Sequence, residues 1–141
     1  MPITCSELLA RAGVAVPSLA ADAALAQLGS PAVVFVDVRD EPELVRYGKI
    51  PGAVHVSRGQ LEFIIDPTGK FHNPVFFGEA RVVFYCMTGV RSLLAANTAR
   101  ELGVTDVANL EGGVRAWVAA GGPIAPHQPD GAAAPTVSRL R

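Results

Sequence analysis

One short segment of the chain combines a thiol, a glycine and a cation, CMTGVR at residues 86–91. It directly follows an apolar run of strand length, residues 81–85, and precedes a helix-like segment, 92–102, that Gly103 closes. The inward-pointing amides of a tight loop, the positive end of a helix and a nearby guanidinium each favour an anion. Such surroundings lower the pKa of a cysteine from ~8.5 to roughly 3.5–7.5. The sequence therefore predicts a reactive thiolate at Cys86 in a cradle that also accepts an anionic substrate.

The alternative for Cys86 is a buried, inert thiol at the end of a strand, because cysteine often serves as a small hydrophobic residue. The glycine, the arginine and the helix that follow it favour the reactive interpretation. Cys5 lies in a terminal helical segment without such neighbours, and we expect it to be inert. The two cysteines form no CxxC pair and no metal-spaced cluster with the histidines, so we expect reduced thiols, no structural zinc site and no cofactor.

The segments around this loop alternate between strand-like and helix-like patterns. Ala- and Leu-rich stretches predict helices at 6–12 and 19–28, with Gly13 and Gly29 as stops and Ser18 as the cap of the second. The continuous apolar run at 32–38 is typical of a strand covered on both faces. Further strands are expected at 53–56, 81–85 and 107–110, and further helices at 92–102 and 113–119. This order predicts an α/β fold with an open parallel sheet and helices on both faces.

Two segments fit the pattern less well. Residues 57–79 combine a helix at 61–65, a turn-rich stretch and aromatic side chains, which makes them either a lid or a well-packed excursion. Residues 125–141 hold Pro, Gly and Ala without apolar periodicity and resemble a mobile tail. We therefore expect one domain at 1–124, with its motif-bearing core at 32–124.

Composition excludes several classes of function. Half of the residues are hydrophobic and 18% are charged, which suits a soluble globular domain. The net charge is -1 and the chain holds no basic run, so we expect no nucleic-acid partner. No apolar run approaches the roughly 20 residues of a membrane helix, and the N-terminus lacks a basic, signal-like start. The expected location is the cytoplasm, without a membrane partner.

Several motifs together resemble the rhodanese family, in its single-domain form. They are DVR at 37–39 with Glu43-Leu44 after it, GKIPGA at 48–53, CMTGVRS at 86–92, and LEGGVRAW at 110–117 followed by AGGP at 120–123. The resemblance implies the rhodanese-like fold and an enzyme that transfers sulfur. In that chemistry Cys86 takes the outer sulfur of a small anionic donor such as thiosulfate and holds it as a persulfide. It then passes the sulfur to a thiol or to cyanide. Thioredoxin, glutathione, cyanide and a biosynthetic protein all remain open as the acceptor.

The sulfur-transfer interpretation also assigns roles to the residues around Cys86. The loop amides would stabilise the terminal sulfur of the persulfide, so that no base is needed. Substrate contacts are expected from the loop itself: Met87, Thr88, Gly89, Val90, Arg91 and Ser92. Arg91 is either a ligand of the donor's sulfonate, which we favour, or a structural cation that neutralises a carboxylate. Asp37 and Arg39 are expected to form a supporting brace, with Glu43 as the candidate third member.

Other conspicuous residues receive structural interpretations. His55 is expected to pack beside its strand, and His72 and His127 to lie in solvent. Gly112, Gly113 and Trp117 are explained by a turn into the last helix and by core packing, and are not predicted site residues. Lys49 stands where a histidine is frequent in the family. With Arg91 as its one cation, the loop should hold small anions weakly, so thiosulfate is expected to be a poor substitute for the physiological donor.

The sequence leaves two alternative functions open. Phosphatases and arsenate reductases of similar fold place an arginine at the sixth residue after the cysteine, whereas Arg91 is the fifth, which gives a narrower cradle suited to sulfur. A persulfide carrier or regulatory module without turnover is the second rival. Retention of Cys86 favours turnover over that alternative without excluding it.

Overall fold

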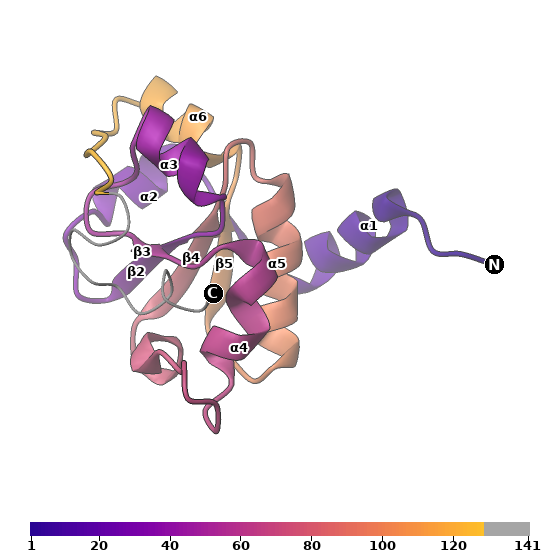
Figure 1. The fold of residues 1–141 in the computed structure, drawn as a ribbon. Coiled ribbons are helices and arrows are strands. Elements are labelled where there is room, and N and C mark those ends of the chain that lie inside the picture. Colours follow the sequence, from indigo (N-terminus) through magenta and orange to yellow (C-terminus); the bar gives the residue numbers. More distant parts are fainter. Residues whose placement is uncertain (129–141) are drawn as a thin grey trace.

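The described part of the chain, residues 1–128, is a layered α/β domain in a computed structural model. Its residues form a five-stranded sheet in the order β1-β5-β4-β2-β3, and all four neighbouring pairs run parallel (Figure 1). The strands are β1 (Ser18–Leu19), β2 (Val33–Asp37), β3 (Val54–His55), β4 (Arg81–Tyr85) and β5 (Val107–Leu110). The predicted open parallel sheet is confirmed, and β4 has the predicted bounds.

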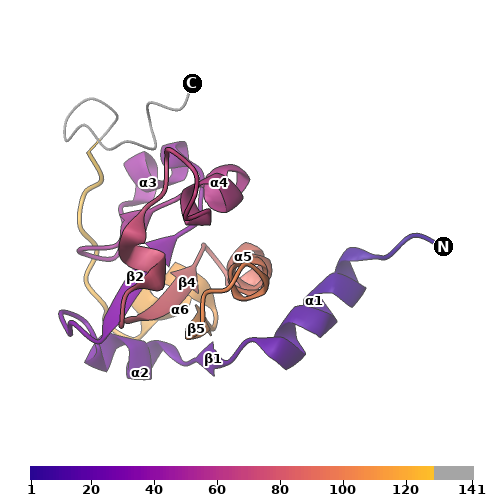
Figure 2. The same cartoon turned by 90° about the horizontal axis from the view of Figure 1, so that it is seen from below.

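Helices cover both faces of this sheet (Figures 1 and 2). They are α1 (Cys5–Ala15), α2 (Ala21–Ala26), α3 (Glu41–Tyr47), α4 (Leu61–Ile65), α5 (Val90–Glu101) and α6 (Gly113–Ala119), with 3₁₀ turns at Arg58–Gln60 and Pro74–Phe77. The strand residues divide between two cores because successive side chains point to opposite faces. Val82 and Phe84 pack with residues of α4 and α5, whereas Val83 and Tyr85 pack with residues of α2 and α6. Burial on both faces explains the continuous apolar runs of β2 (residues 33–36) and β4 (residues 82–85).

The N-terminal region differs from the prediction. Gly13 does not end the first helix, which continues to Ala15. Ser18 and Leu19 form the edge strand β1 and pair with Asn109 and Leu110 of β5, and α2 starts only at Ala21 after an N-cap at Ala20. Pairing with the open edge of the sheet outweighs the helical preference of so short a segment. Figure 2 shows α1 leading away from the body of the domain, with its last turns nearest to α5.

The segment at 57–79 is a packed excursion and not a lid. Ile64, Ile65 and Phe76 are each at most 2% exposed and belong to the core on the α5 side of the sheet. Phe76 stacks against Phe84 of β4 with ring centroids 6.2 Å apart. Of its aromatic residues, Phe63 and Phe77 remain exposed.

The segment expected to be a tail begins with ordered contacts. Ala125 pairs antiparallel with Lys49 through two backbone hydrogen bonds of 2.8 and 2.9 Å. The rest of the predicted tail, residues 129–141, lies outside the described residues. Within residues 1–128, every helix is too short or too polar to cross a membrane.

Candidate active site

The Cys86 thiol lies directly beyond the carboxyl end of β4, inside the loop that leads into α5. Its residue is 1% exposed. The amides of Gly89 and Ser92 point at Sγ from 3.2 and 3.4 Å, and Ser92 Oγ lies 3.3 Å away. The predicted loop of inward-facing amides is therefore present around the sulfur, at the edge of the sheet where α/β proteins bind ligands.

This environment lowers the pKa of Cys86. Burial is the largest single effect and raises the pKa, but the hydrogen bonds from the Ser92 side chain and from the amides of Ser92, Gly89 and Thr88 together outweigh it. The lowered pKa agrees with the sequence prediction. Its main causes are the loop amides and the Ser92 hydroxyl, whereas the sequence argument also relied on the charge of Arg91.

The side chain of Asn109 in β5 holds the Cys86 loop through two hydrogen bonds, a role that was not predicted from the sequence. Its side chain is buried, its Nδ2 donates to the carbonyl of Gly89 at 2.9 Å, and its Oδ1 accepts the Ser92 hydroxyl at 2.6 Å. In this arrangement the Cys86 thiol donates to Ser92 Oγ, and the hydroxyl can turn towards the sulfur when the thiol ionises. A polar residue in an otherwise apolar, buried strand was the available signal.

The start of α6 holds the other side of the loop. The amides of Val114 and Arg115 donate to the carbonyls of Cys86 and Met87 at 2.9 and 3.2 Å. A Cβ on Gly113, whose φ is +64°, would lie 2.6 Å from the Cys86 carbonyl oxygen. The expected turn into the last helix is confirmed, but Gly113 also permits the close approach of the loop. Trp117 is fully buried, as expected.

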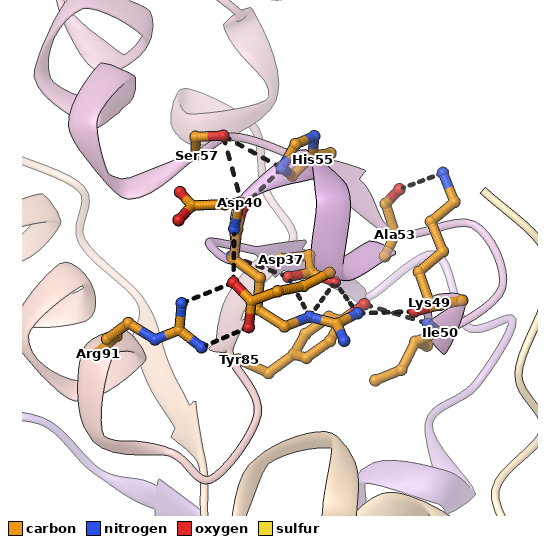
Figure 3. A network of polar contacts seen from close by, with 12 residues as sticks. Asp37, Asp40, Lys49, Ile50, Ala53, His55, Ser57, Tyr85 and Arg91 are labelled. Carbon is orange, nitrogen blue, oxygen red and sulfur yellow. Dashed lines mark hydrogen bonds and ion pairs between the residues drawn. The ribbon is translucent and has the colours of Figure 1, made fainter. Parts of the chain in front are cut away.

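Arg91 forms an ion pair with the carboxylate of Glu43 (Figure 3). Its two terminal nitrogens donate to the two oxygens of Glu43, each at 2.9 Å. This pairing raises the pKa of Arg91 and lowers that of Glu43. The geometry matches the alternative that we did not favour, a structural cation. Contrary to the expectation, Glu43 does not join the Asp37–Arg39 pair. Its carboxylate faces Arg91 and the backbone amide of Asp40 instead.

The ion pair predicted between Asp37 and Arg39 is present. Both side chains are fully buried, their closest charged atoms lie 2.6 Å apart, and Arg39 also donates to the carbonyl of Gly48 at 2.8 Å. The Arg39 guanidinium lies over the ring of Tyr85, 5.7 Å from its centroid. Figure 3 shows this network, in which the Tyr85 hydroxyl accepts the amide of Ile50.

The remaining loop side chains carry no charge. Met87 packs on the core at the α6 side, and Thr88 and Val90 are exposed. Of the histidines, His55 lies beside its strand as expected and contacts the carbonyl of Arg39. The prediction that His127 lies in solvent is wrong: its side chain is 8% exposed and contacts Glu41. His72 is also partly buried, against the carbonyl of Ile65.

Comparison with known families gives this architecture a name. The model of the rhodanese-like domain matches residues 20–120, which include β2 to α6 and the entire Cys86 loop. The chain belongs to the rhodanese-like domain family. The resemblance noted in the motifs is thereby confirmed, and so is the rhodanese-like fold.

Relatives of known description include sulfurtransferases. A mouse thiosulfate sulfurtransferase/rhodanese-like domain-containing protein 3 is 34% identical over 64% of this chain, which spans only 61% of that relative. The human thiosulfate:glutathione sulfurtransferase is 32% identical over 58% of this chain and 76% of its own length. A solved Rhodopseudomonas palustris protein of unknown function, described as a possible tyrosine phosphatase, is 44% identical, with a TM-score of 0.83 over 89% of this chain and 99% of its own.

Proposed function

We propose that this rhodanese-like protein is a sulfurtransferase that carries sulfur as a Cys86 persulfide. The observation that carries the proposal is the position of Sγ, which accepts the amides of Gly89 and Ser92 inside a loop whose one charged side chain, Arg91, is paired with Glu43. Donors in a fixed ring stabilise an anion without reorganising during the reaction. Such a ring suits both the attacking thiolate and the persulfide anion that replaces it.

The reaction consists of two displacements. The Cys86 thiolate attacks the outer sulfur of thiosulfate, a bond between Sγ and that sulfur forms, and the sulfur–sulfur bond of the donor breaks to release sulfite. An acceptor thiolate then attacks the terminal sulfur, takes it as a new persulfide and leaves the Cys86 thiolate free. With cyanide as acceptor the product is thiocyanate. Neither step requires an oxidant, a reductant or a general base.

Arg91 has a secondary role in this scheme. Both of its terminal nitrogens are occupied by Glu43, so the pair presents little net charge to a donor. We therefore infer weak binding of thiosulfate and better use of donors that do not depend on a sulfonate contact. The acceptor is a small or protein-borne thiol; thioredoxin and glutathione are the candidates to compare.

A phosphatase is the second candidate, because the Rhodopseudomonas palustris relative is described as a possible tyrosine phosphatase. Glu43 competes for the Arg91 guanidinium that phosphoryl transfer needs for binding phosphate oxygens, which disfavours this candidate. The short spacing between Cys86 and Arg91 points the same way.

One parallel assay separates these functions. Thiocyanate formation from thiosulfate and cyanide, and hydrolysis of an aryl phosphate, are measured on the wild type, on Cys86→Ser and on Cys5→Ser. We expect thiocyanate formation that Cys86→Ser abolishes and Cys5→Ser retains, without phosphate release. Cys86-dependent phosphate release without sulfur transfer would overturn the proposal in favour of a phosphatase. Loading of Cys86 with sulfur, but no release to any acceptor, would favour the carrier function.

A further inference from the structure

Three side chains from distant parts of the chain meet at the start of α3. Glu41 is the first residue of α3, His55 ends β3, and His127 follows the bridge between Lys49 and Ala125. One ligand atom from each lies within 4.8 Å of the other two. His127 Nε2 is 3.1 Å from Glu41 Oε2, and the two imidazole rings meet edge to face with centroids 5.5 Å apart.

His55 is held in the orientation of a metal ligand. Its Nε2 lies 2.7 Å from the carbonyl oxygen of Arg39, and a carbonyl can only accept, so Nε2 carries the proton. The lone pair of the neutral ring is then on Nδ1. Histidines that bind metals commonly donate their other N–H to a backbone carbonyl in this way, which fixes both the tautomer and the ring. Figure 3 shows His55 beside Ser57, whose Oγ lies 3.3 Å from Nε2.

His127 is a buried member of the cluster, and one of its two ring nitrogens is unpaired within the described residues. Its side chain is more than nine-tenths buried, and its Nδ1 has no hydrogen-bond partner within the described residues. A buried nitrogen without a hydrogen-bond partner lowers the stability of the folded state, because it has lost its contact with water and gained nothing in return. The other nitrogen of the ring already faces the Glu41 carboxylate.

We propose that Glu41, His55 and His127 bind a divalent transition-metal ion of the zinc class. Two imidazoles and one carboxylate form a donor set that zinc accepts with a further position left for water. Calcium and magnesium prefer oxygen ligands and fit two imidazoles poorly. The site could not be predicted from the sequence, because its ligands are separated by 14 and 72 residues and share no spacing motif.

The site does not depend on the proposed sulfur transfer. Bound metal fastens the segment around His127 to the start of α3, the helix that also carries Glu43. Metal binding is therefore expected to stabilise the fold, increasingly so as the free metal concentration rises above the dissociation constant, whatever reaction Cys86 performs.

The test uses the full-length chain without a histidine tag, carrying Cys5→Ser and Cys86→Ser so that no thiol competes for metal. Co²⁺ is titrated and followed by its visible absorbance, and Zn²⁺ is followed by the shift in melting temperature. We expect one ion per chain, an affinity at least ~10-fold weaker in Glu41→Gln and in His127→Gln, and no change in His72→Gln. Absence of saturable binding, or equal affinity in His127→Gln and His72→Gln, would overturn the proposal.

A second measurement covers the case in which a variant does not fold. Nitrogen NMR of the histidine rings in the same thiol-free chain reports the ligands directly. Zn²⁺ should shift the ring nitrogens of His55 and His127 and leave those of His72 in place. A shift at His72 alone, or at none of the three, would contradict the site.

Discussion

Two charged pairs lie near the same end of the sheet and differ in their contact with water. The Asp37–Arg39 pair is fully buried against the ring of Tyr85, whereas in the Glu43–Arg91 pair the side chains are 26% and 43% exposed. A buried pair that loses one partner leaves an unpaired charge in a region of low dielectric constant. An exposed pair can exchange its partner for water or for a solute at little cost. The first pair therefore maintains the fold, and the second is the one that can respond to a substrate.

Breaking the buried pair should have the largest effect. Asp37→Asn leaves the Arg39 charge buried without its carboxylate, and we expect a loss of about 3–5 kcal/mol in the free energy of unfolding. Urea unfolding followed by circular dichroism measures it. Glu43→Gln is the matched control and should cost no more than about 1 kcal/mol. Equal losses in the two variants would remove the distinction between the pairs.

The next effect concerns the thiol. Ser92→Ala removes a hydroxyl that lowers the pKa of Cys86, so that pKa should rise, and the rise should exceed the one caused by Arg91→Ala. The ultraviolet absorbance of the thiolate against pH reports the titration, with Cys86→Ser as the blank. A larger rise in Arg91→Ala than in Ser92→Ala would show that the guanidinium, and not the loop, controls the thiol.

The lowered pKa also gives a pH dependence with a definite sign. A thiol whose folded pKa lies below its unfolded value stabilises the folded state above the unfolded pKa, and this contribution is lost as the pH falls through the folded pKa. Wild type should therefore gain stability relative to Cys86→Ser as the pH rises towards the ordinary thiol range. Urea midpoints of both proteins across this range measure the gain, and a constant difference would contradict the lowered pKa.

The smallest expected effect is on donor binding. Glu43→Gln leaves Arg91 charged but without its carboxylate, so the KM for thiosulfate should fall by a few-fold with little change in kcat. Arg91→Lys retains a charge without the paired geometry and serves as the comparison. An unchanged KM in Glu43→Gln would mean that Arg91 does not face the donor.

Local sequence predicted those parts of the site whose members are neighbours in the chain. Asp37 and Arg39 stand two residues apart at the end of one strand, and Cys86 to Ser92 form one loop, so the brace and the amide cradle could both be predicted. The apolar runs of β2 and β4 predicted the centre of the sheet for the same reason.

Contacts between distant segments could not be predicted in this way. Arg91 and Glu43 are 48 residues apart, and nothing in either segment indicates the other. Asn109 appears as one polar residue in a short strand until the fold places it under Ser92. The two residues of β1 carry too little pattern to reveal a strand that exists only through its pairing with β5.

The central claim is that Cys86 holds sulfur as a persulfide, and intact mass spectrometry tests it most directly. The reduced protein is measured before and after brief exposure to thiosulfate, with Cys86→Ser and Cys5→Ser treated alike. The account predicts a gain of about 32 Da, one sulfur atom on a nucleophilic cysteine, in the wild type and in Cys5→Ser. Cyanide should remove it, and Cys86→Ser should not acquire it. A gain that persists in Cys86→Ser, or the absence of any gain with thiosulfate and with polysulfide, would contradict the account.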